Sequence, residues 1–172
     1  MLEIEKKFLV YSPWGESHSS TLIEQGYLFI EKTRSLRVRR QNEDYFLTLK
    51  IEKSKNERFE FESKIKEEEG NLLLKKHCIS NIISKIRNII FHDNTRWEVD
   101  VFTGENENLI VAEVELSSAN HEFATPSWLG PEVTKQNRYL NSNLSQKPFS
   151  EWGITYKNLL LEESKKNKET TL

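Results

Sequence analysis

Short segments in which hydrophobic and polar residues alternate recur along the chain, and this pattern predicts β-strands. Successive side chains of a strand point to opposite faces of its sheet, so each segment has one hydrophobic face. The predicted strands cover residues 3–10, 25–30, 35–40, 44–51, 58–65, 84–90, 96–102 and 109–116. Because antiparallel sheet edges must be paired, covered or closed, we expect an α+β fold: a closed or nearly closed antiparallel β-barrel of about eight strands with helices packed outside it.

A few other segments predict helices and loops. Residues 67–83 are expected to form a helix, because acidic residues come first and lysines follow, as the helix dipole favours. Two prolines predict a loop at 125–134. We also expect a helical turn at 19–24, a short helix at 138–145 and a helix over 154–172 that frays into a polar tail at about 164–172.

Composition adds that the chain is a charge-rich globular protein. Of its 172 residues, 30% are charged, and the formal net charge is −2. This balance gives no generic attraction to nucleic acid or an anionic membrane, and no hydrophobic run approaches the roughly 20 residues that span a bilayer. The single cysteine, Cys78, and a charged start without a signal peptide predict a cytoplasmic protein. We expect one domain over residues 1–172 and leave its oligomeric state open.

The polar faces of the predicted strands carry charges that are sorted by sign. Acidic side chains share a face at Glu3 and Glu5, Glu60 and Glu62, Glu98 and Asp100, and Glu113 and Glu115. Basic side chains do so at Arg37 and Arg39, and at Lys85 and Arg87, while Lys7 and Lys50 lie on the polar faces of their own strands. One such face is usually just solvated, but a wet surface would mix the signs. Seven sorted strands therefore predict a barrel interior that binds a polyanion together with a divalent cation.

These strands resemble a known family. EIEKK is similar to the Glu-x-Glu-x-Lys signature of the CYTH superfamily, the triphosphate tunnel metalloenzymes. The resemblance continues through QGYL, LRVRR, FLTLK, RFEFE, KIR, WEVDVF, AEVEL and EVTKQNRYLNSNL, in the family's order, and covers about residues 1–148. It implies a tunnel domain of the compact bacterial type.

The resemblance also implies roles for individual residues. The positions that match triphosphate-binding residues are Lys7, Arg37, Arg39, Lys50, Lys85 and Arg87, with Lys135 and Arg138 as further phosphate contacts. Those that match residues holding Mg²⁺ or Mn²⁺, or orienting its waters, are Glu3, Glu5, Asp100, Glu113 and Glu115, with Glu60 and Glu62 as a further acidic pair. Tyr27 matches a tyrosine that pairs with Lys7 in catalysis, and we expect Lys7 to lower the pKa of Tyr27.

Two positions depart from the family's pattern. Gln136 stands where relatives often carry aspartate, and Asn88 follows Arg87 where they often carry tyrosine. Gln136 puts the local metal or loop chemistry in question.

The expected activity is metal-dependent hydrolysis of a small triphosphate, with inorganic tripolyphosphate cleaved to pyrophosphate and phosphate. Two other enzymes share the tunnel: thiamine triphosphatase, and class IV adenylate cyclase, which needs an adenine pocket. A polyphosphate- or nucleotide-binding module without catalysis is the alternative outside the enzymes. The presence of both signature glutamates, of Lys7 and of both AEVEL glutamates favours an enzyme.

Overall fold

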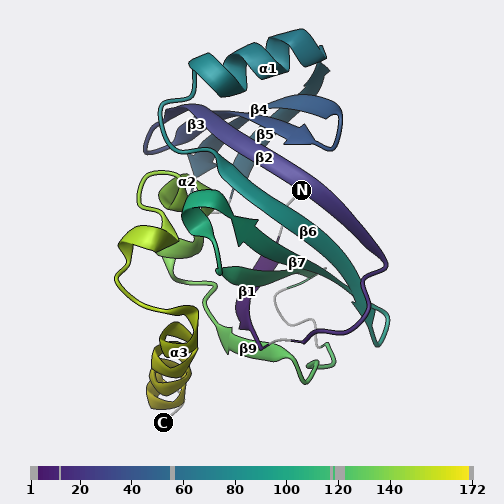
Figure 1. Ribbon diagram of the computed structural model, residues 1–172, viewed down its shortest axis with the longest axis vertical. Helices are drawn as coiled ribbons and strands as arrows, with labels where there is room; N and C mark the ends of the chain where they lie inside the picture. Colours follow the sequence, from purple (N-terminus) through teal and green to yellow (C-terminus); the bar gives the residue numbers. More distant parts are fainter. Residues whose placement is uncertain (1–3, 12, 55–56, 117, 119–122, 171–172) are drawn as a thin grey trace.

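The fold is built on one antiparallel sheet of nine strands in a computed structural model that describes residues 4–11, 13–54, 57–116, 118 and 123–170 (Figure 1). The strands are β1 (Ile4–Val10), β2 (Ser19–Ile30), β3 (Arg34–Gln41), β4 (Asp44–Ser54), β5 (Glu57–Ile65), β6 (Ile83–His92), β7 (Thr95–Thr103), β8 (Ile110–Leu116) and β9 (Leu129–Glu132). Their order is β5-β4-β3-β2-β6-β7-β8-β1-β9, so β5 and β9 are the edges among the described residues. The predicted α+β fold on an antiparallel sheet is confirmed, with nine strands in place of about eight.

The described residues also form helices, and the two longest of these, α1 (Glu67–Lys76) and α3 (Tyr156–Thr170), lie at opposite ends of the molecule (Figure 1). The others are α2 (Asn141–Leu144) and the short 3-10 helices η1 (Gly104–Asn106), η2 (Asn137–Tyr139) and η3 (Phe149–Glu151). Helix α1 contacts β2, β3 and β4 at one end, and α3 contacts β9 at the other (Figure 1). Among the described residues, no helix has the length and hydrophobicity needed to span a membrane.

Residues 19–24 form the first half of β2, so the predicted helical turn is wrong. This strand is hydrogen-bonded to β3 on one side and to β6 on the other. Backbone pairing with two neighbouring strands outweighs the weak local preference of a six-residue segment. The strand β2 therefore begins at Ser19, six residues before the segment predicted from the sequence.

Helix α1 ends at Lys76, so the helix predicted over 67–83 is too long, and Ile83 instead begins β6. Gly70, which weakens the helix by itself, allows close packing on the sheet. A Cβ atom at Gly70 would lie 2.2 Å from Cδ1 of Tyr45. Any larger residue would therefore push α1 away from the strand that carries Tyr45.

The C-terminal part of the chain differs from its prediction in two places. The segment 125–134 contains the short strand β9, which tolerates Pro131 because an edge strand needs hydrogen bonds on one side only. The tail predicted to fray from about residue 164 is helical as far as Thr170. The short helix predicted at 138–145 is present as η2 and α2.

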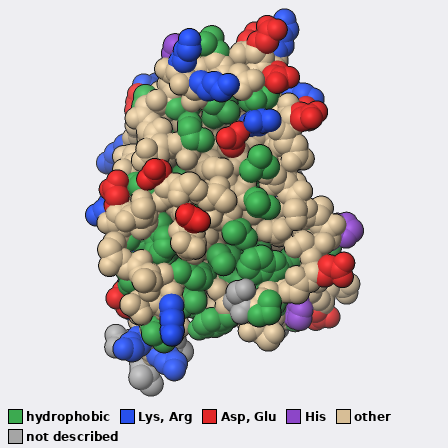
Figure 2. Space-filling view, viewed as in Figure 1, with side chains coloured by type: hydrophobic (Ala, Val, Ile, Leu, Met, Phe, Trp, Pro, Cys, Tyr) green, Lys and Arg blue, Asp and Glu red, His purple; other side chains and the backbone are tan. Residues whose placement is uncertain are grey.

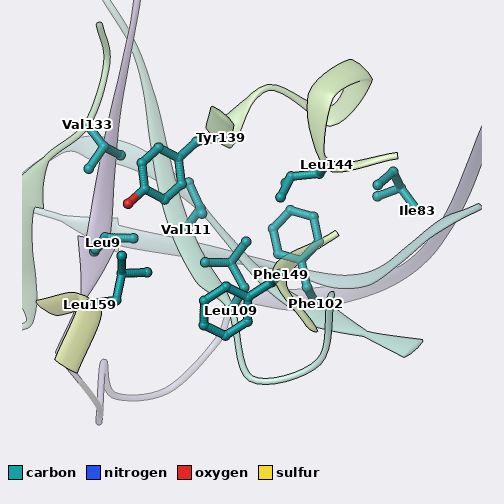
Figure 3. Packing of buried hydrophobic residues seen from close by; sticks show 10 residues of the cluster. All are labelled: Leu9, Ile83, Phe102, Leu109, Val111, Val133, Tyr139, Leu144, Phe149 and Leu159. Carbon is teal, nitrogen blue, oxygen red and sulfur yellow. The ribbon is translucent and has the colours of Figure 1, made fainter. Parts of the chain in front are cut away.

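The inner face of the curled sheet is divided into a charged part and a hydrophobic part. Leu9 follows Lys7 by two residues, and Val111 precedes Glu113 by two, so in each strand both residues share a face. The buried cluster shown in Figure 3 consists of Leu9, Ile83, Phe102, Leu109, Val111, Val133, Tyr139, Leu144, Phe149 and Leu159. Side chains from the segment between Val133 and Leu159 thus fill one end of the space that the sheet encloses.

A second buried cluster covers the opposite face of the same strands. Trp97 is fully buried there and makes edge-to-face contacts with Phe8 and Trp128, at centroid distances of 5.9 and 5.5 Å. Figure 2 shows hydrophobic side chains gathered across the lower half of one face of the molecule, while lysines lie at the C-terminal end of α3. Hydrophobic packing behind the strands holds their charged faces toward the interior.

Candidate functional site

The charged part of the inner face surrounds a cavity of about 730 Å³. Eight strands, β1 to β8, contribute to its wall, and residues 30–35 and parts of 137–143 complete it. The ionisable side chains from the strands are Glu5, Lys7, Tyr27, Arg34, Arg37, Arg39, Lys50, Glu52, Glu60, Glu62, Lys85, Arg87, Arg96, Glu98, Glu113 and Glu115. Most of the residues predicted from the sequence to form the site therefore meet at one place.

The structure confirms the prediction of which basic side chains of β3 point into the interior. Arg37 and Arg39 line the cavity. Arg40 points the other way, where its Nε donates to the carbonyl oxygen of Asn42 at 2.7 Å and its Nη1 pairs with Glu24 at 3.2 Å. The period-two pleat thus separates two adjacent arginines into one that faces the cavity and one that does not.

Lys7 lies between two carboxylates. Its Nζ contacts Oε1 of Glu5 at 2.5 Å and also contacts Oε1 of Glu113, which is directly opposite Lys7 in the β1–β8 register. Burial disfavours the charged ammonium, but Glu113 and Glu5 outweigh that effect and raise the pKa of Lys7. Burial, followed by the charge of Glu113, raises the pKa of Glu5. Glu5 and Glu113 therefore repel one another across Lys7, and added positive charge would stabilise them.

Arg87 joins three carboxylates beside this cluster. Its Nε and Nη2 each lie 2.7 Å from an oxygen of Asp100, its Nη2 lies 3.1 Å from Glu113, and its Nη1 contacts Glu98. The three carboxylates raise the pKa of Arg87 despite its burial. Arg87 thus remains a fixed positive charge in the cavity wall.

The position of Asp100 differs from the one predicted for a metal ligand. Its side chain is 1% exposed, does not line the cavity and contacts both Lys85 and Arg87. Burial lowers the pKa of Lys85, and the charge of Asp100 opposes that shift. Asp100 therefore acts as the buried counter-ion of two basic residues, beneath the cavity surface.

The wall formed by β3, β4 and β5 carries cations paired with acids from the edge strand. Lys50 lies 2.8 Å from Glu60, Arg39 lies 3.2 Å from Glu62, and Arg37 lies 3.9 Å from Glu60. Burial, followed by the charge of Arg37, lowers the pKa of Arg39, so the two guanidinium groups repel each other. Glu60 and Glu62 thus serve as counter-ions to the basic wall in this arrangement.

Two buried donors in the basic wall are unsatisfied. Within the described part of the chain, the Nε atoms of Arg37 and Arg39 are buried and have no hydrogen-bond partner. Leaving a buried donor unpaired is costly, more so when the group is charged. A bound anion would satisfy both donors and reduce the repulsion between the two arginines.

Tyr27 lines the cavity and is 5% exposed. Its hydroxyl accepts a hydrogen bond of 3.0 Å from Nε2 of Gln25, which is also buried. Burial raises the pKa of Tyr27, and the nearby charges of Arg37 and Lys7 only reduce that rise. Lys7 thus acts on this pKa in the expected direction, but burial outweighs it, so the pKa of Tyr27 is raised and its hydroxyl stays protonated at physiological pH.

Two predicted phosphate contacts are not in the cavity. Lys135 is exposed and does not line it. Arg138 points toward α3, where its guanidinium contacts Glu163 and lies 4.6 Å from the ring centroid of Trp152. The contact of Arg138 with α3 joins segments that lie far apart in the sequence, so the strand pattern could not reveal it. Glu3 lies outside the described residues.

The two departures from the family pattern are also away from the cavity wall. Nε2 of Gln136 donates to Glu163 of α3. Asn88 is 8% exposed, and its Oδ1 accepts a hydrogen bond of 2.7 Å from Ser20. Because side chains alternate along β6, Asn88 and Arg87 point to opposite faces of the strand.

Sequence reasoning did not assign some of the residues in the wall. Glu98 lines the cavity and pairs with Arg87, although only its neighbour Asp100 was given a role. Gln25 is two residues from Tyr27, and this spacing could have identified it as a second inward-facing side chain. The part of the wall formed by residues 137–143 had no signal in the strand pattern.

The carboxylates can take part in binding a divalent cation. In the described residues, no three acidic, histidine or cysteine side chains converge into a complete metal site. Glu5, Glu113 and Glu115 nevertheless place oxygen donors on adjacent strands at one side of the cavity. Mg²⁺ commonly binds through one or two carboxylates, several waters and the phosphates of its substrate. The residues present fit that mode of binding.

Glu113 is expected to make the fold sensitive to acid. Lys7, Lys85 and Arg87 outweigh burial and hold the pKa of Glu113 well below its ordinary value of 4.5. A carboxylate with a lowered pKa stabilises the fold at pH values above its unfolded-state pKa. This stabilisation is lost as the pH falls below about 4.5. The raised pKa of Glu5 acts in the opposite direction.

Urea unfolding at several pH values tests this expectation. The midpoint of the wild type should fall between about pH 5 and pH 3, and that of Glu113→Gln should fall clearly less. Glu105→Gln, which changes an exposed carboxylate on η1, is the control and should follow the wild type. If the urea midpoints of all three proteins fell by the same amount with pH, the expectation would be contradicted.

Comparisons with known proteins agree with this geometry. The CYTH domain family model matches residues 1–147. The chain is 42% identical over 151 residues to an inorganic triphosphatase of Acetivibrio thermocellus, covering 86% of this chain and 95% of that protein. It is 37% identical over 149 residues to an inorganic triphosphatase of Nitrosomonas europaea, covering 84% and 97%.

A solved structure supports the same relationship. The crystal structure of an inorganic triphosphatase superimposes with a TM-score of 0.67 at 35% identity, covering 84% of this chain and 95% of that chain. The match includes the strands whose charged faces meet in the cavity. On its sequence, its fold and the arrangement of its charged cavity, this chain belongs to the CYTH domain family.

Proposed function

We propose that this protein hydrolyses inorganic tripolyphosphate to pyrophosphate and phosphate with the help of a divalent cation. The observation that carries the proposal is the pair of buried, unpartnered Nε donors of Arg37 and Arg39 in a cavity lined by both signs of charge. Relatives at 42% and 37% identity are inorganic triphosphatases, which supports the same activity here.

The substrate binds between two basic walls. Arg37, Arg39 and Lys50 form one wall, and Lys7, Lys85 and Arg87 form the other. Arginine and lysine donate charge-assisted hydrogen bonds to phosphate oxygens, and arginine can do so through two nitrogens at once. Because these cations are held by neighbouring carboxylates, they are already in position to stabilise the charge that develops on the leaving pyrophosphate.

The acidic side of the cavity binds Mg²⁺ or Mn²⁺. Glu5, Glu113 and Glu115 supply the ligands, and Glu3, which lies outside the described residues, adds a fourth carboxylate in this proposal. When bound, the cation neutralises phosphate charge and makes water a better nucleophile. Glu5 and Glu113 repel each other across Lys7, so binding of a cation also stabilises the protein.

Lys7 and Tyr27 are the proposed catalytic residues. Because Gln25 donates to the Tyr27 hydroxyl, the phenolic hydrogen is free to be donated into the cavity. Burial keeps Tyr27 neutral, so we assign it the role of a hydrogen-bond donor to the substrate or the attacking water. Lys7 contributes positive charge between Glu5 and Glu113.

The cavity wall disfavours the nucleotide alternatives. Tyr27 is the one aromatic residue in that wall within the described chain, and it is nearly fully buried. A base or thiazolium ring would therefore find no exposed aromatic surface on which to stack. Adenylate cyclase and thiamine triphosphatase activities, and nucleotide binding without catalysis, are less compatible with this wall than tripolyphosphate hydrolysis.

An assay panel tests the proposal directly. We expect tripolyphosphate to be cleaved with a kcat/KM at least about tenfold higher than that of ATP or thiamine triphosphate, with Mg²⁺ or Mn²⁺ present and not with EDTA. Phosphate release and cyclic AMP are measured together. Formation of cyclic AMP as the main product from ATP would favour the cyclase, and binding of tripolyphosphate without release of phosphate would favour a non-catalytic module.

A further inference from the structure

Helix α3 lies beyond residues 1–147, the part matched by the family model, yet it is attached to the strand that carries Lys7. Leu159 is fully buried in the cluster that fills one end of the sheet, next to Leu9 (Figure 3). The hydroxyl of Tyr156 accepts a hydrogen bond of 2.8 Å from the amide of Val10, and its single hydrogen lies within reach of two carbonyl oxygens, of Val10 in β1 and Ile110 in β8. Asn167 donates to the carbonyl oxygen of Glu132 at 3.1 Å.

Glu163 is the polar centre of this attachment. Its side chain has no exposed surface. Gln136 and Arg138 both donate to it from the segment that follows β9, and Lys166 pairs with it at 2.8 Å. A fully buried carboxylate needs such partners, so Glu163 fixes α3 to the segment containing Gln136 and Arg138.

The same segment holds the main chain of Lys7. The amide of Val133 donates to the carbonyl oxygen of Lys7 at 2.8 Å, and the amide of Lys7 donates to Oγ1 of Thr134 at 3.1 Å. The amide of Gln136 donates to the carbonyl oxygen of Val133 at 2.9 Å, which closes a tight turn over residues 133–136. Both polar main-chain groups of Lys7 therefore bind a turn that Glu163 anchors at its far end.

The segment also reaches the cavity itself. Leu140 follows Arg138 by two residues, and it lines the cavity together with Asn137 and with Asn141, Ser142 and Asn143 of α2. A shift of this segment would therefore displace both the Lys7 main chain and part of the cavity wall. A displacement of about 1 Å can reduce turnover by as much as ~100-fold when it misplaces a catalytic group.

We infer that Glu163 is a positioning residue for catalysis: through Gln136 and Arg138 it holds the 133–136 turn, and through that turn it sets the position of Lys7. The inference rests on the proposed function, because it gives Lys7 a role in tripolyphosphate hydrolysis. Helix α3 is thereby part of the apparatus that positions the catalytic cavity, although it contributes no side chain to the cavity wall within the described residues.

The test compares two ways of loosening α3. Glu163→Ala removes the anchor of the turn, whereas Tyr156→Phe removes hydrogen bonds between α3 and the strands and leaves the turn in place. We expect Glu163→Ala to lower kcat by about tenfold with a smaller change in KM, and Tyr156→Phe to keep kcat within about twofold of the wild type. Thermal unfolding of each variant, followed by assay well below its midpoint, ensures that folded protein is compared.

Substitutions at Thr134 provide a second test. Thr134→Val removes the acceptor of the Lys7 amide and should lower kcat as Glu163→Ala does, while Thr134→Ser should restore it. The double variant of Glu163→Ala and Thr134→Val should lose less than the product of the two single losses, because both act on the same turn.

Two outcomes overturn the inference. In the first, kcat falls in proportion to the loss of thermal stability, and to the same degree in Glu163→Ala and Tyr156→Phe. In the second, the loss of kcat in the double variant equals the product of the two single losses, which means that Glu163 and Thr134 act independently. A wild-type protein that releases no phosphate from tripolyphosphate would instead contradict the proposed function, so the two failures are distinguishable.

Discussion

Replacing Glu5 by glutamine is expected to lower turnover of tripolyphosphate at least about 100-fold while leaving the metal-free protein as stable as the wild type, or more stable. Glu5 supplies a proposed metal ligand, so its loss should impair cation binding and catalysis. Burial and the charge of Glu113 raise the pKa of Glu5 in the folded protein above its value in the unfolded chain. The contribution of Glu5 to the stability of the fold is therefore fully present below the unfolded-state pKa and is lost as the pH rises through the folded-state pKa. At neutral pH, ionised Glu5 therefore destabilises the fold, and a neutral amide removes that cost.

Activity assays and melting curves, with and without ligand, separate the possible results. Mn²⁺ with tripolyphosphate should raise the melting temperature of the wild type and raise that of Glu5→Gln much less. Glu24→Gln is the matched control, because Glu24 pairs with Arg40 on the opposite face of the sheet at 3.2 Å. A metal-free Glu5→Gln protein that melts well below the wild type would instead identify Glu5 as a structural partner of Lys7.

Arg39→Ala should reduce kcat/KM for tripolyphosphate by roughly 10- to 100-fold, whereas Arg40→Ala should leave it almost unchanged. Hydrogen bonds to charged groups contribute about 1.5–3 kcal/mol each, and about 1.4 kcal/mol corresponds to a tenfold change in rate. Arg39 faces the cavity with an unpartnered buried Nε, while Arg40 is bonded to Asn42 and Glu24 outside it. Steady-state kinetics of the two alanine variants provide the measurement.

The two arginines are adjacent, which makes them closely matched controls for one another. Each also lies over an aromatic ring, Arg39 at 5.6 Å from the centroid of Phe46 and Arg40 at 5.8 Å from that of Tyr45. Loss of stacking alone should therefore be similar in both variants. Equal losses of activity in the two variants would mean that it does not matter for catalysis whether an arginine of β3 points into the cavity. The cavity could then no longer be the site of hydrolysis.

The sequence by itself determined which side chains of each strand share a face. Alternation is a local property of the pleated backbone, so the pairing of Arg37 with Arg39, and of Glu113 with Glu115, follows from positions two residues apart. The sorting of charges by sign then indicated one interior for both, and the ordered motifs indicated the family. The cavity lined by these residues confirms that part of the prediction.

Local signals failed where longer-range pairing decides the structure. Residues 19–24 lack a strong strand pattern, yet all of them pair with β6, and Ile23 and Glu24 also pair with β3. The short strand β9 exists because β1 offers it a partner. Hydrogen bonds between segments far apart in the sequence stabilise such elements, and local propensity contains no information about those partners.

Only the tertiary structure decided which charges meet. The register of β1 and β8 sets Lys7 opposite Glu113, whereas Asp100 is covered by Lys85 and Arg87 and leaves the cavity surface. The fold likewise turns Arg138 toward Glu163, and Arg138 does not line the cavity. Whether a charged side chain is a ligand or a buried counter-ion depends on which opposite charge lies within a few ångströms of it, and that distance is set by strand order and helix docking.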